Sequence, residues 1–439
     1  MRNWTWIATL ILSSTVLATS ASPTPIGSLH GSNARYVNDI KHCPALTRKA
    51  EATNIHDVRP DDFSVVMALG DSITAGLFAT PSELSKENLV VDAIEKPVRR
   101  FRGQPQRYLG TGASSFIPGF EEYRGISYAM GDDEGAETIP NMIRYYRNES
   151  VKGTSHEHHP PPIIPSPPQI PIGDHVAAND GLNAALSGSK AKDLTSQVKN
   201  YLLPSLESLD IQDHEWKLLT LSIGANDVCD YCLSGASSSH LGPGSPEAFV
   251  AHIEEAVELV RQSIPRTIVN VVGLFTVSEI YNLTTKEPQC TPLSLPPIFP
   301  RLPLECSCAW APGAIGDATR KKMDTLGEEY AEGLQEMVKR IRKRAIAEQG
   351  DKVDFGIVWQ PGSFLPLGSF PTTTLSPTDC FHPSAQAHGR IATGLWNRLV
   401  LNGSEKRKPM AWDNEAFLER LGKQGRIRCM EETDRVHFD

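Results

Sequence analysis

The chain has 439 residues, of which 40% are hydrophobic, and it carries a formal net charge of −9. This length and apolar content suffice for one large domain or two modest ones with a sizeable core. Proteins that bind the nucleic-acid backbone present a basic face. The two short basic segments here, RIRKR at 340–344 and EKRKP at 405–409, lie beside acidic residues. We interpret them as solvated surface and expect no nucleic-acid partner.

The first 25 residues have the organisation of a secretory signal peptide. MRNWTWIATLILSSTVLATSASPTP contains Arg2, an apolar core from about Trp6 to Ala18, and small residues before a proline. We predict a signal peptide over residues 1–21, because the core is too short to span a membrane comfortably; a buried N-terminal helix is the alternative. No other segment approaches the length of a membrane span, and the C-terminal residues are polar. We therefore expect a secreted, extracellular protein without a transmembrane or lipid anchor.

The first predicted strand, SVVMALG at 64–70, ends in a turn that contains a candidate nucleophile. Asp71 and Ser72 follow the strand directly and open a predicted helical turn. In open α/β folds, ligands bind at the carboxyl edge of the sheet, and a helix N-terminus offers backbone N–H groups that stabilise negative charge. Taken alone, Ser72 is explained as well by a helix cap as by a nucleophile.

The segment HEHHPPPIIPSPPQIPIGDH at 156–175 is too rich in proline for a helix or a sheet. Its composition predicts an exposed, extended loop. Its histidines could bind a metal, but they lack a defined ligand geometry, so we favour a solvated loop. They are His156, His158, His159 and His175.

Two further predicted elements carry groups that could stabilise an oxyanion. Gly188 lies in a turn before a predicted helix at 192–208, where its backbone N–H could face a substrate. Asn226 follows the predicted strand at 216–224, and its side chain can donate an N–H to an oxyanion. Each also has a structural interpretation, as a turn glycine and as a helix cap. The neighbouring Asp227 is interpreted as a cap or a structural acid.

The second half of the chain alternates between predicted helices and strands. Helices are predicted at 246–263 and 316–348, and strands at 267–274 and 353–360. Because nearly continuous apolar strands alternate with helical segments, the sequence predicts parallel strands joined by crossovers, which is an α/β fold. The Pro/Leu-rich segment at 287–310 breaks this pattern. It could cover an active site or touch lipid, although ordinary packing is the favoured interpretation.

A candidate base lies in the segment SPTDCFHPSAQAHGRIATGLWNRLV at 376–400. Asp379 precedes His382 by three residues in one tight turn, so its carboxylate can reach Nδ1 of the imidazole and leave Nε2 facing Ser72. A surface turn is the alternative for this pair alone, and His388 is interpreted as structural. The chain contains no G-x-S-x-G, H-E-x-x-H or G-x-x-x-x-G-K-[ST] motif, which excludes three common enzyme signatures.

Eight cysteines, an even number, predict disulfides in a secreted chain. Eight cysteines permit many connectivities, so the pairing stays open. Zinc binding is the disfavoured alternative and no metal is expected; the zinc ligands would be Cys229, Cys232, Cys306 and Cys308. Glycosylation in a eukaryotic secretory pathway is predicted at three sequons, which begin at Asn148, Asn282 and Asn402.

Four motifs occur in the order found in the SGNH, or GDSL, hydrolases. They are GDS-x-T around Ser72, a loop glycine at Gly188, G-x-N-D at 224–227 and D-x-x-H at 379–382. The chain most resembles the phospholipase B1-like branch of that family. The stretches that carry this resemblance are HDVRPDDFSVVMALGDSITAG, RGISYAMGDDEGAETIPN, LNAALSGSKAKDL, GANDVCDYC and DCFHPSAQAHGRIATGLWN.

The resemblance covers residues 43–403 and implies a three-layer, flavodoxin-like SGNH hydrolase fold with a central, mainly parallel sheet. The Pro/His-rich segment at 148–179 looks like an insertion into this catalytic domain, and residues 404–439 look like a C-terminal extension. The C-terminal membrane span of the mammalian membrane-bound form has no counterpart here, which favours a secreted enzyme.

The resemblance also implies an activity, the hydrolysis of acyl esters in phospholipids and lysophospholipids without a cofactor. Carried over by motif, Ser72 is the nucleophile, His382 the base and Asp379 its partner. The oxyanion donors would be the N–H groups of Ser72 and Gly188 and the side chain of Asn226. Such a substrate suggests peripheral contact with lipid aggregates. The alternatives are an SGNH esterase acting on acetylated glycans or short-chain esters, and a catalytically silent binding protein of the same fold.

Overall fold

The computed structural model describes residues 35–47, 50–80, 121–164, 170–171, 175–230, 244–285, 306–310, 313–408 and 426–438. The predicted signal peptide and most of the Pro/Leu-rich segment lie outside these residues. No helix in the described part of the chain is long and apolar enough to cross a membrane. The three asparagines predicted to be glycosylated are all exposed.

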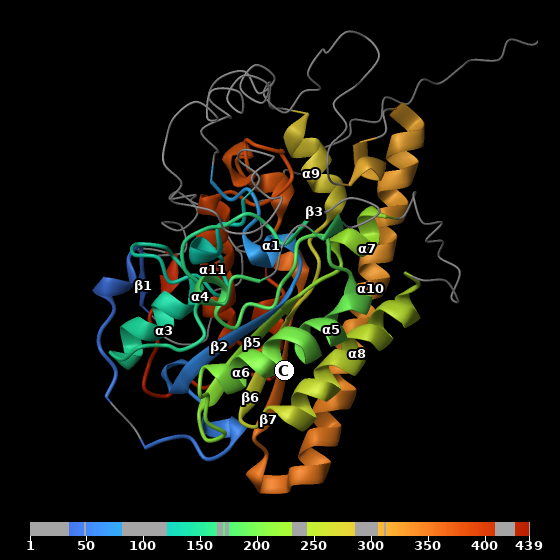
Figure 1. Ribbon diagram of the computed structural model, residues 1–439. Coiled ribbons are helices and arrows are strands. Elements are labelled where there is room, and N and C mark those ends of the chain that lie inside the picture. The colour runs from blue at the N-terminus through green and yellow to red at the C-terminus, as the bar shows by residue number, and fades with distance from the viewer. Residues whose placement is uncertain are drawn as a thin grey trace, which may run out of the picture. The chain divides into compact units, whose positions relative to one another are not determined.

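The centre of the structure is a four-stranded parallel sheet in the order β2–β5–β6–β7 (Figure 1). Nearly all of its residues are buried, because helices cover both faces. The four predicted strands and the predicted α/β class are confirmed, and each observed strand ends within two residues of its predicted bounds. The strands are β2 Phe63–Gly70, β5 Trp216–Ser222, β6 Thr267–Val272 and β7 Phe355–Gln360.

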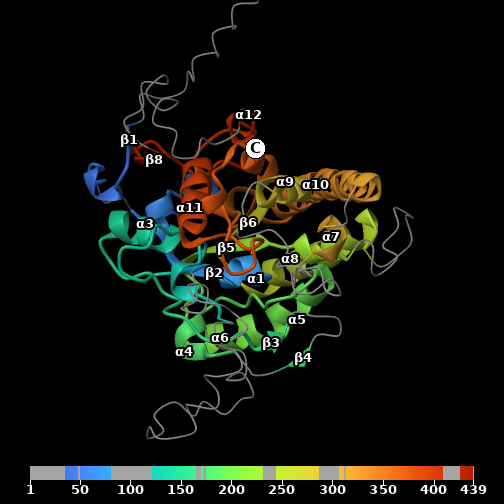
Figure 2. The same cartoon turned by 90° about the horizontal axis from the view of Figure 1, so that it is seen from above.

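Helices form the two outer layers, as the views in Figures 1 and 2 show. One layer contains α5, α8 and α10, and the other contains α3 and α11. The α-helices are α1 Ser72–Ala75, α3 Ile139–Arg147, α4 Ala177–Asp180, α5 Leu194–Gln197, α6 Leu203–Ser208, α7 Ala225–Cys229, α8 Pro246–Ser263, α9 Val277–Thr284, α10 Gly313–Gln349, α11 Ala385–Leu399 and α12 Gly403–Lys406.

The predicted helix at 192–208 is divided by a π-helical segment, Val198–Leu202, between α5 and α6. Pro204 explains the interruption, because it has no N–H to donate to the carbonyl four residues earlier. The predicted helix at 246–263 is confirmed as α8. Ser245 caps it by accepting the N–H of Ala248 at 3.2 Å.

Two irregular segments cover the outer edge of β2. The N–H of Val66 donates to the carbonyl of Lys152 at 3.0 Å, and the N–H of Ala68 donates to that of Leu182 at 3.1 Å. The N–H of Ala184 then returns a hydrogen bond to the carbonyl of Ala68 at 3.0 Å. These bonds satisfy an edge that would otherwise be open to other strands. They also bring the Gly188 loop alongside the strand that precedes Ser72.

The Pro/His-rich segment differs from the predicted solvated loop. It contains a short antiparallel pair, β3 Ile163–Ile164 and β4 Ile170–Pro171, and His159 is only 8% exposed. Nε2 of His159 and Nδ1 of His175 lie 2.6 and 2.8 Å from the two carboxylate oxygens of Asp180. Because a buried carboxylate is costly without such donors, these two histidines pack against Asp180 rather than lie in solvent. His156 and His158 are exposed, as predicted.

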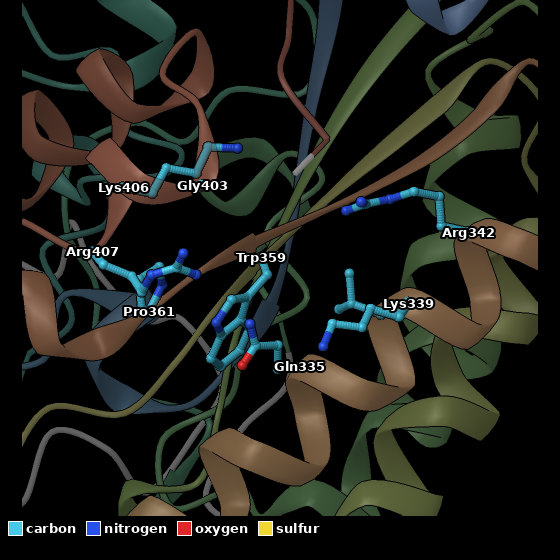
Figure 3. A pocket seen from close by; sticks show the side chains of 9 residues that line it. Gln335, Lys339, Arg342, Trp359, Pro361, Gly403, Lys406 and Arg407 are labelled. Carbon is cyan, nitrogen blue, oxygen red and sulfur yellow. The ribbon is translucent and has the colours of Figure 1, made fainter.

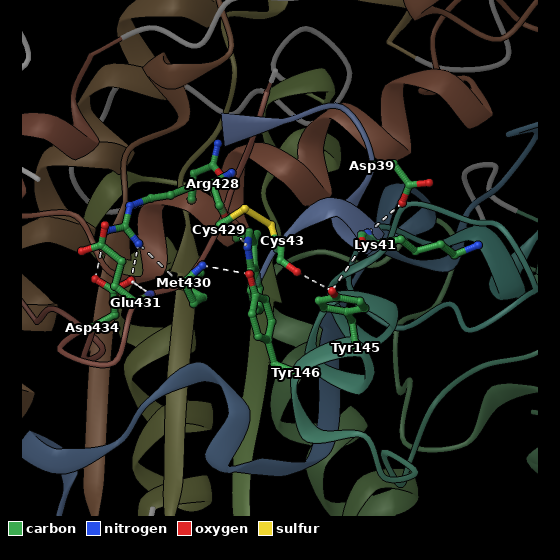
Figure 4. The surroundings of a disulfide bond; sticks show 12 residues. Asp39, Lys41, Cys43, Tyr145, Tyr146, Arg428, Cys429, Met430, Glu431 and Asp434 are labelled. Atoms are coloured by element: carbon green, nitrogen blue, oxygen red, sulfur yellow. Dashed lines mark hydrogen bonds and ion pairs between the residues drawn. A yellow bond between two sulfur atoms is a disulfide. The ribbon is translucent and has the colours of Figure 1, made fainter. Parts of the chain in front are cut away.

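A disulfide between Cys43 and Cys429 joins the two ends of the described chain (Figure 4). Strands β1 Tyr36–Val37 and β8 Ile427–Arg428 pair beside it. Two tyrosines of α3 form hydrogen bonds to the backbone beside the disulfide. Tyr145 donates to the carbonyl of Cys43 at 2.6 Å, and Tyr146 accepts the N–H of Met430 at 2.9 Å. Of the segment predicted as a C-terminal extension, residues 426–438 therefore pack against α3 and the N-terminal strand β1.

A second disulfide links Cys229 with Cys306, and Cys380 is also disulfide-bonded. The predicted use of the cysteines in disulfides is thus confirmed for these residues. The zinc alternative is wrong, because two of its four ligands are consumed in one covalent bond. Among the described residues, no group of three or more His, Cys, Asp or Glu side chains is placed to hold a metal.

Replacing both Cys43 and Cys429 by alanine should lower the free energy of unfolding by about 2–5 kcal/mol, because the cross-link closes a loop of 386 residues. Urea unfolding of the oxidised proteins would measure the change. Tyr145→Phe, which removes the hydroxyl that donates to the carbonyl of Cys43 and, at 3.4 Å, to that of Lys41, serves as the control and should cost about 1 kcal/mol. Equal stability of the double variant and the wild type would contradict the prediction.

Candidate active site

In the turn after β2, Asp71 and Ser72 have different roles. Asp71 is the N-cap of α1, and its carboxylate accepts the N–H of Ile73 at 3.0 Å. Ser72 is the first residue of the helix and is 3% exposed. The capping role thus falls to Asp71, and the hydroxyl of Ser72 takes part in a different hydrogen bond.

The side chains of Ser72, His382 and Asp379 form a hydrogen-bonded series. Ser72 Oγ lies 2.8 Å from His382 Nε2, and His382 Nδ1 lies 2.5 Å from Asp379 Oδ2. Because Nδ1 faces a carboxylate, it carries the proton, and Nε2 is then the acceptor for the hydroxyl of Ser72. This arrangement can remove a proton from the serine and stabilise the imidazolium that forms.

A tight turn holds Asp379 beside the imidazole, as the spacing of three residues predicts. Asp379 Oδ1 accepts the backbone N–H groups of Phe381 and His382 at 3.0 and 3.1 Å. The intervening Cys380 has a left-handed φ of 58° and is disulfide-bonded. The imidazole of His382 is fully buried, so water does not compete for its hydrogen bonds from outside.

The loop that contains Gly188 is anchored on both sides. Before the glycine, the N–H of Leu186 donates to the carbonyl of Gly70 at 3.2 Å. After it, the side-chain amide of Asn226 donates to the carbonyl of Ser189 at 2.9 Å. The structure thus brings Gly188 between the strand that leads to Ser72 and the side chain of Asn226.

Gln197 is a site residue that the sequence analysis missed. Its amide accepts the N–H of Gly70 at 3.0 Å and donates to the carbonyl of the same residue at 2.7 Å. It also donates to Ser189 Oγ at 3.1 Å. A buried glutamine in a helix leaves no recognisable pattern in a sequence, so its role emerges only from the fold.

Two carboxyls near the site, those of Asp71 and Asp227, are buried. Burial raises the pKa of Asp71 to about 6, although its hydrogen bond from Ile73 opposes the shift. Burial likewise raises the pKa of Asp227 to about 7, against a hydrogen bond from the N–H of Ala191 at 3.1 Å. Asp227 is therefore a structural acid rather than a helix cap, since Gly224 occupies the N-cap of α7.

His388 is structural, in agreement with the sequence interpretation. Its ring is buried, and its Nδ1 accepts the backbone N–H of Tyr128 at 3.2 Å. Burial, with the neighbouring His382, lowers the pKa of His388 to about 3. It stays neutral at any pH at which the protein would work.

An apolar cavity of about 60 Å³ adjoins the turn of Ser72. Asp71 and Ile73 form its wall on the side of the nucleophile. The rest of the lining is mostly hydrophobic, and much of it comes from the loops after β6 and β7 and from α11; it includes Leu274, Phe275, Leu367, Phe381, Ala387 and Ile391. Such a lining favours a hydrocarbon chain over a polar group.

The two basic segments of the sequence meet at a separate pocket between α10 and α12 (Figure 3). Lys339 and Arg342 reach it from one helix and Lys406 from the other. Each cation has an acceptor within the protein: Glu336 at 2.7 Å, the carbonyl of Ile357 at 3.1 Å and the carbonyl of His437 at 2.5 Å, respectively. Lys339 pairs within its own helix, whereas Arg342 and Lys406 bond to β7 and to the C-terminal residues. The interpretation as solvated surface is thus too simple for Arg342 and Lys406.

The sequence of this chain matches the family described as GDSL-like Lipase/Acylhydrolase over residues 66–395. The chain therefore belongs to this family of carboxylic ester hydrolases, and the predicted family and fold are confirmed.

Membrane-associated phospholipase B1 proteins are similar to this chain. The human protein is 28% identical over 382 residues, which are 83% of this chain and 21% of that protein. The mouse protein is 27% identical over 357 residues, which are 79% of this chain and 20% of that protein. The chain thus spans about a fifth of the length of these curated relatives.

Matches among solved structures include an extracellular lipase from Streptomyces rimosus and the acetylxylan esterase Axe2 from Geobacillus stearothermophilus. The lipase is 13% identical with a TM-score of 0.30, and the match covers 74% of this chain and 94% of that one. The esterase is 12% identical with a TM-score of 0.31, and the match covers 82% of this chain and 94% of that one.

Asp227→Asn should change how stability depends on pH. A carboxyl whose pKa is higher in the folded state than in the unfolded state binds more protons when folded, so Asp227 makes the free energy of unfolding fall as pH rises from about 4 to about 7. Asparagine retains an acceptor for Ala191 and should abolish this contribution, which is at most about 1.4 kcal/mol per pH unit.

Urea unfolding of the wild type and the variant between pH 4 and 8 would test this expectation. The variant should be the more stable protein above pH 7. Asp351→Asn, at an exposed position, should leave the pH dependence of the wild type unchanged. Parallel stability curves for the wild type and Asp227→Asn would contradict the prediction.

Proposed function

We propose that this protein is a secreted serine esterase that hydrolyses the acyl ester bonds of phospholipids and lysophospholipids through an acyl-enzyme on Ser72. The observation that carries the proposal is the hydrogen-bonded series of Ser72, His382 and Asp379 at the carboxyl edge of the sheet. Membership of the GDSL-like family supports it. The similarity to phospholipase B1 supports the choice of a phospholipid substrate.

In the proposed reaction, Ser72 Oγ attacks the ester carbonyl while His382 Nε2 takes its proton. The negative oxygen of the tetrahedral intermediate is bound by the N–H groups of Ser72 and Gly188 and by the side-chain amide of Asn226. Asp379 holds the imidazolium in place. His382 then returns the proton to the departing alcohol, which leaves the acyl group on Ser72.

Deacylation repeats these steps with water as the nucleophile. His382 removes a proton from the water, the same donors bind the second oxyanion, and the fatty acid departs as Ser72 recovers its proton. The apolar cavity beside Ile73 suits the carbons of the acyl chain nearest the carbonyl, whose burial is favourable by about 0.8 kcal/mol per methylene. No step uses a metal or a cofactor.

Secretion is the proposed setting of this activity. The Cys43–Cys429 and Cys229–Cys306 disulfides support it, because such bonds persist in oxidising compartments. The signal-peptide pattern at 1–21 and the exposed sequons agree with this setting. The acyl chain must leave a lipid aggregate to reach Ser72, so we expect peripheral contact with micelles or zwitterionic lipid.

Ser72→Ala should abolish hydrolysis of lysophosphatidylcholine, with a loss of about 10⁴–10⁶ in kcat and little change in thermal stability. A fluorophosphonate probe should label the wild type at Ser72 and leave the variant unlabelled. Ser208→Ala, at an exposed serine of α6, is the matched control and should keep full activity and labelling. An active Ser72→Ala variant would exclude the proposed mechanism.

Ala387→Leu should shift the preference toward shorter acyl chains, because the three added carbons fill the apolar cavity of about 60 Å³. We expect kcat/KM for a palmitoyl ester to fall at least tenfold relative to that for a butyryl ester. Ala385→Leu, at an exposed position on the same helix, should not change the ratio. If the wild type hydrolyses only acetyl and butyryl esters and no phospholipid, the short-chain or glycan esterase is the better assignment.

A further inference from the structure

A cluster of fully buried charges lies behind the Gly188 loop. Arg124 is at its centre, and its guanidinium donates to Glu122 Oε2 from Nε at 2.9 Å and from Nη2 at 2.7 Å. The same Nε lies 3.1 Å from Asp180 Oδ1. All three side chains have no exposed surface, so water does not screen these charges.

His159 completes the cluster as a cation. Its Nε2 faces the carboxylate of Asp180 at 2.6 Å, and its Nδ1 faces the carbonyl of Pro160 at 2.7 Å. Both partners can only accept, so both ring nitrogens must carry a proton to satisfy the two contacts. With His159 protonated, the two cations balance the two anions, Glu122 and Asp180.

The cluster holds the loop that carries Gly188. Arg124 donates to the carbonyl of Asn183 at 3.0 Å and to that of Ala185 at 2.8 Å. The hydroxyl of Ser187, the residue directly before Gly188, donates to Glu122 Oε1 at 2.5 Å. One guanidinium and one carboxylate therefore determine where the backbone on the N-terminal side of Gly188 lies.

We infer that Glu122, Arg124 and protonated His159 are positioning residues. Through the hydrogen bond between Ser187 and Glu122, they hold the N–H of Gly188 at the place where the oxyanion forms. This inference rests on the proposed function, because it concerns a donor of that reaction. A misplaced oxyanion donor weakens binding of the transition state and leaves binding of the substrate nearly unchanged.

Ser187→Ala tests the link that is closest to the donor. We expect kcat for a lysophospholipid or an aryl ester to fall about 10- to 100-fold, below the 10²–10³ that complete loss of a donor costs. KM should change less than twofold. The inhibition constant of a trifluoromethyl ketone, which forms an oxyanion on the serine, should rise in parallel with the loss in kcat.

Thr267→Val is the matched control for the loss of a buried hydroxyl. Thr267 lies at the start of β6, away from the site, and donates to the carbonyl of Ile264 at 2.9 Å. This variant should lower the melting temperature and leave kcat and inhibitor affinity unchanged. Wild-type values of kcat and inhibitor affinity in Ser187→Ala would overturn the inference.

The two proposals fail in different ways. If the fluorophosphonate probe does not label wild-type Ser72, the proposed function is wrong. If the wild type is labelled and active while Ser187→Ala matches it, the function stands and the positioning role is wrong.

The proton on His159 offers a second readout. The hydrogen bond and charge of Asp180 raise the pKa of His159, although burial and Arg124 oppose them. The charge of Glu122 also acts on this imidazole. His175 Nδ1 lies 2.8 Å from Asp180 Oδ2, and the charge of Asp180 acts on Tyr201. Deprotonation would leave the cluster with a net negative charge and one acceptor without a donor.

Activity of the wild type should therefore decline as the pH rises above the ordinary imidazole range, in addition to any change caused by His382. His159→Gln should have a lower kcat at neutral pH and should lack this alkaline decline. If the activity of His159→Gln declined at alkaline pH with the same midpoint as that of the wild type, His159 would not belong to the positioning cluster.

Discussion

The end of β2 at Gly70 is the constraint on which the rest of the site depends. A side chain has no room there, because a Cβ on Gly70 would lie 2.6 Å from the carbonyl oxygen of Ser222. Gln197 binds both polar groups of the Gly70 backbone, and Leu186 donates to the same carbonyl. A strand, a helix and the Gly188 loop thus meet one residue before the cap of α1. The hydroxyl of Ser72 is placed by this junction rather than by its own contacts alone.

The sequence predicts those parts of the molecule whose physical signal is local. Continuous apolar runs identify the four central strands, because such strands are covered on both faces. Asp379 and His382 are predictable because three residues in one turn bring a carboxylate to an imidazole. The bonds of Gln197 to Gly70 and of Arg124 to Asn183 join residues 127 and 59 positions apart. Periodicity states which face of an element is buried, but it does not state which polar partner a buried side chain will meet.

Histidines illustrate the same limit. The spacing that marks His382 as a base is absent around His159, and the surrounding prolines indicate a solvated loop. The structure places His159 in the interior because Asp180, 21 residues away, offers it a buried carboxylate. In His388, by contrast, burial without a carboxylate partner keeps the ring neutral. His382, His159 and His388 thus differ in which ring nitrogens carry a proton, because their hydrogen-bond partners differ. Amino-acid composition alone does not distinguish them.

The buried charges near the site are expensive as a means of stabilising a fold. Replacing a buried ion pair by well-packed apolar side chains is often neutral or even stabilising, and Asp71 and Asp227 each bear a desolvation cost that raises their pKa. An apolar replacement for Arg124, however, could not bind the loop carbonyls of Asn183 and Ala185 and two carboxylates at once. The cluster therefore gives directional hydrogen bonds to a loop that has no regular secondary structure. A catalytic donor on such a loop requires that kind of support, since displacement by about 1 Å can cost 10² in rate.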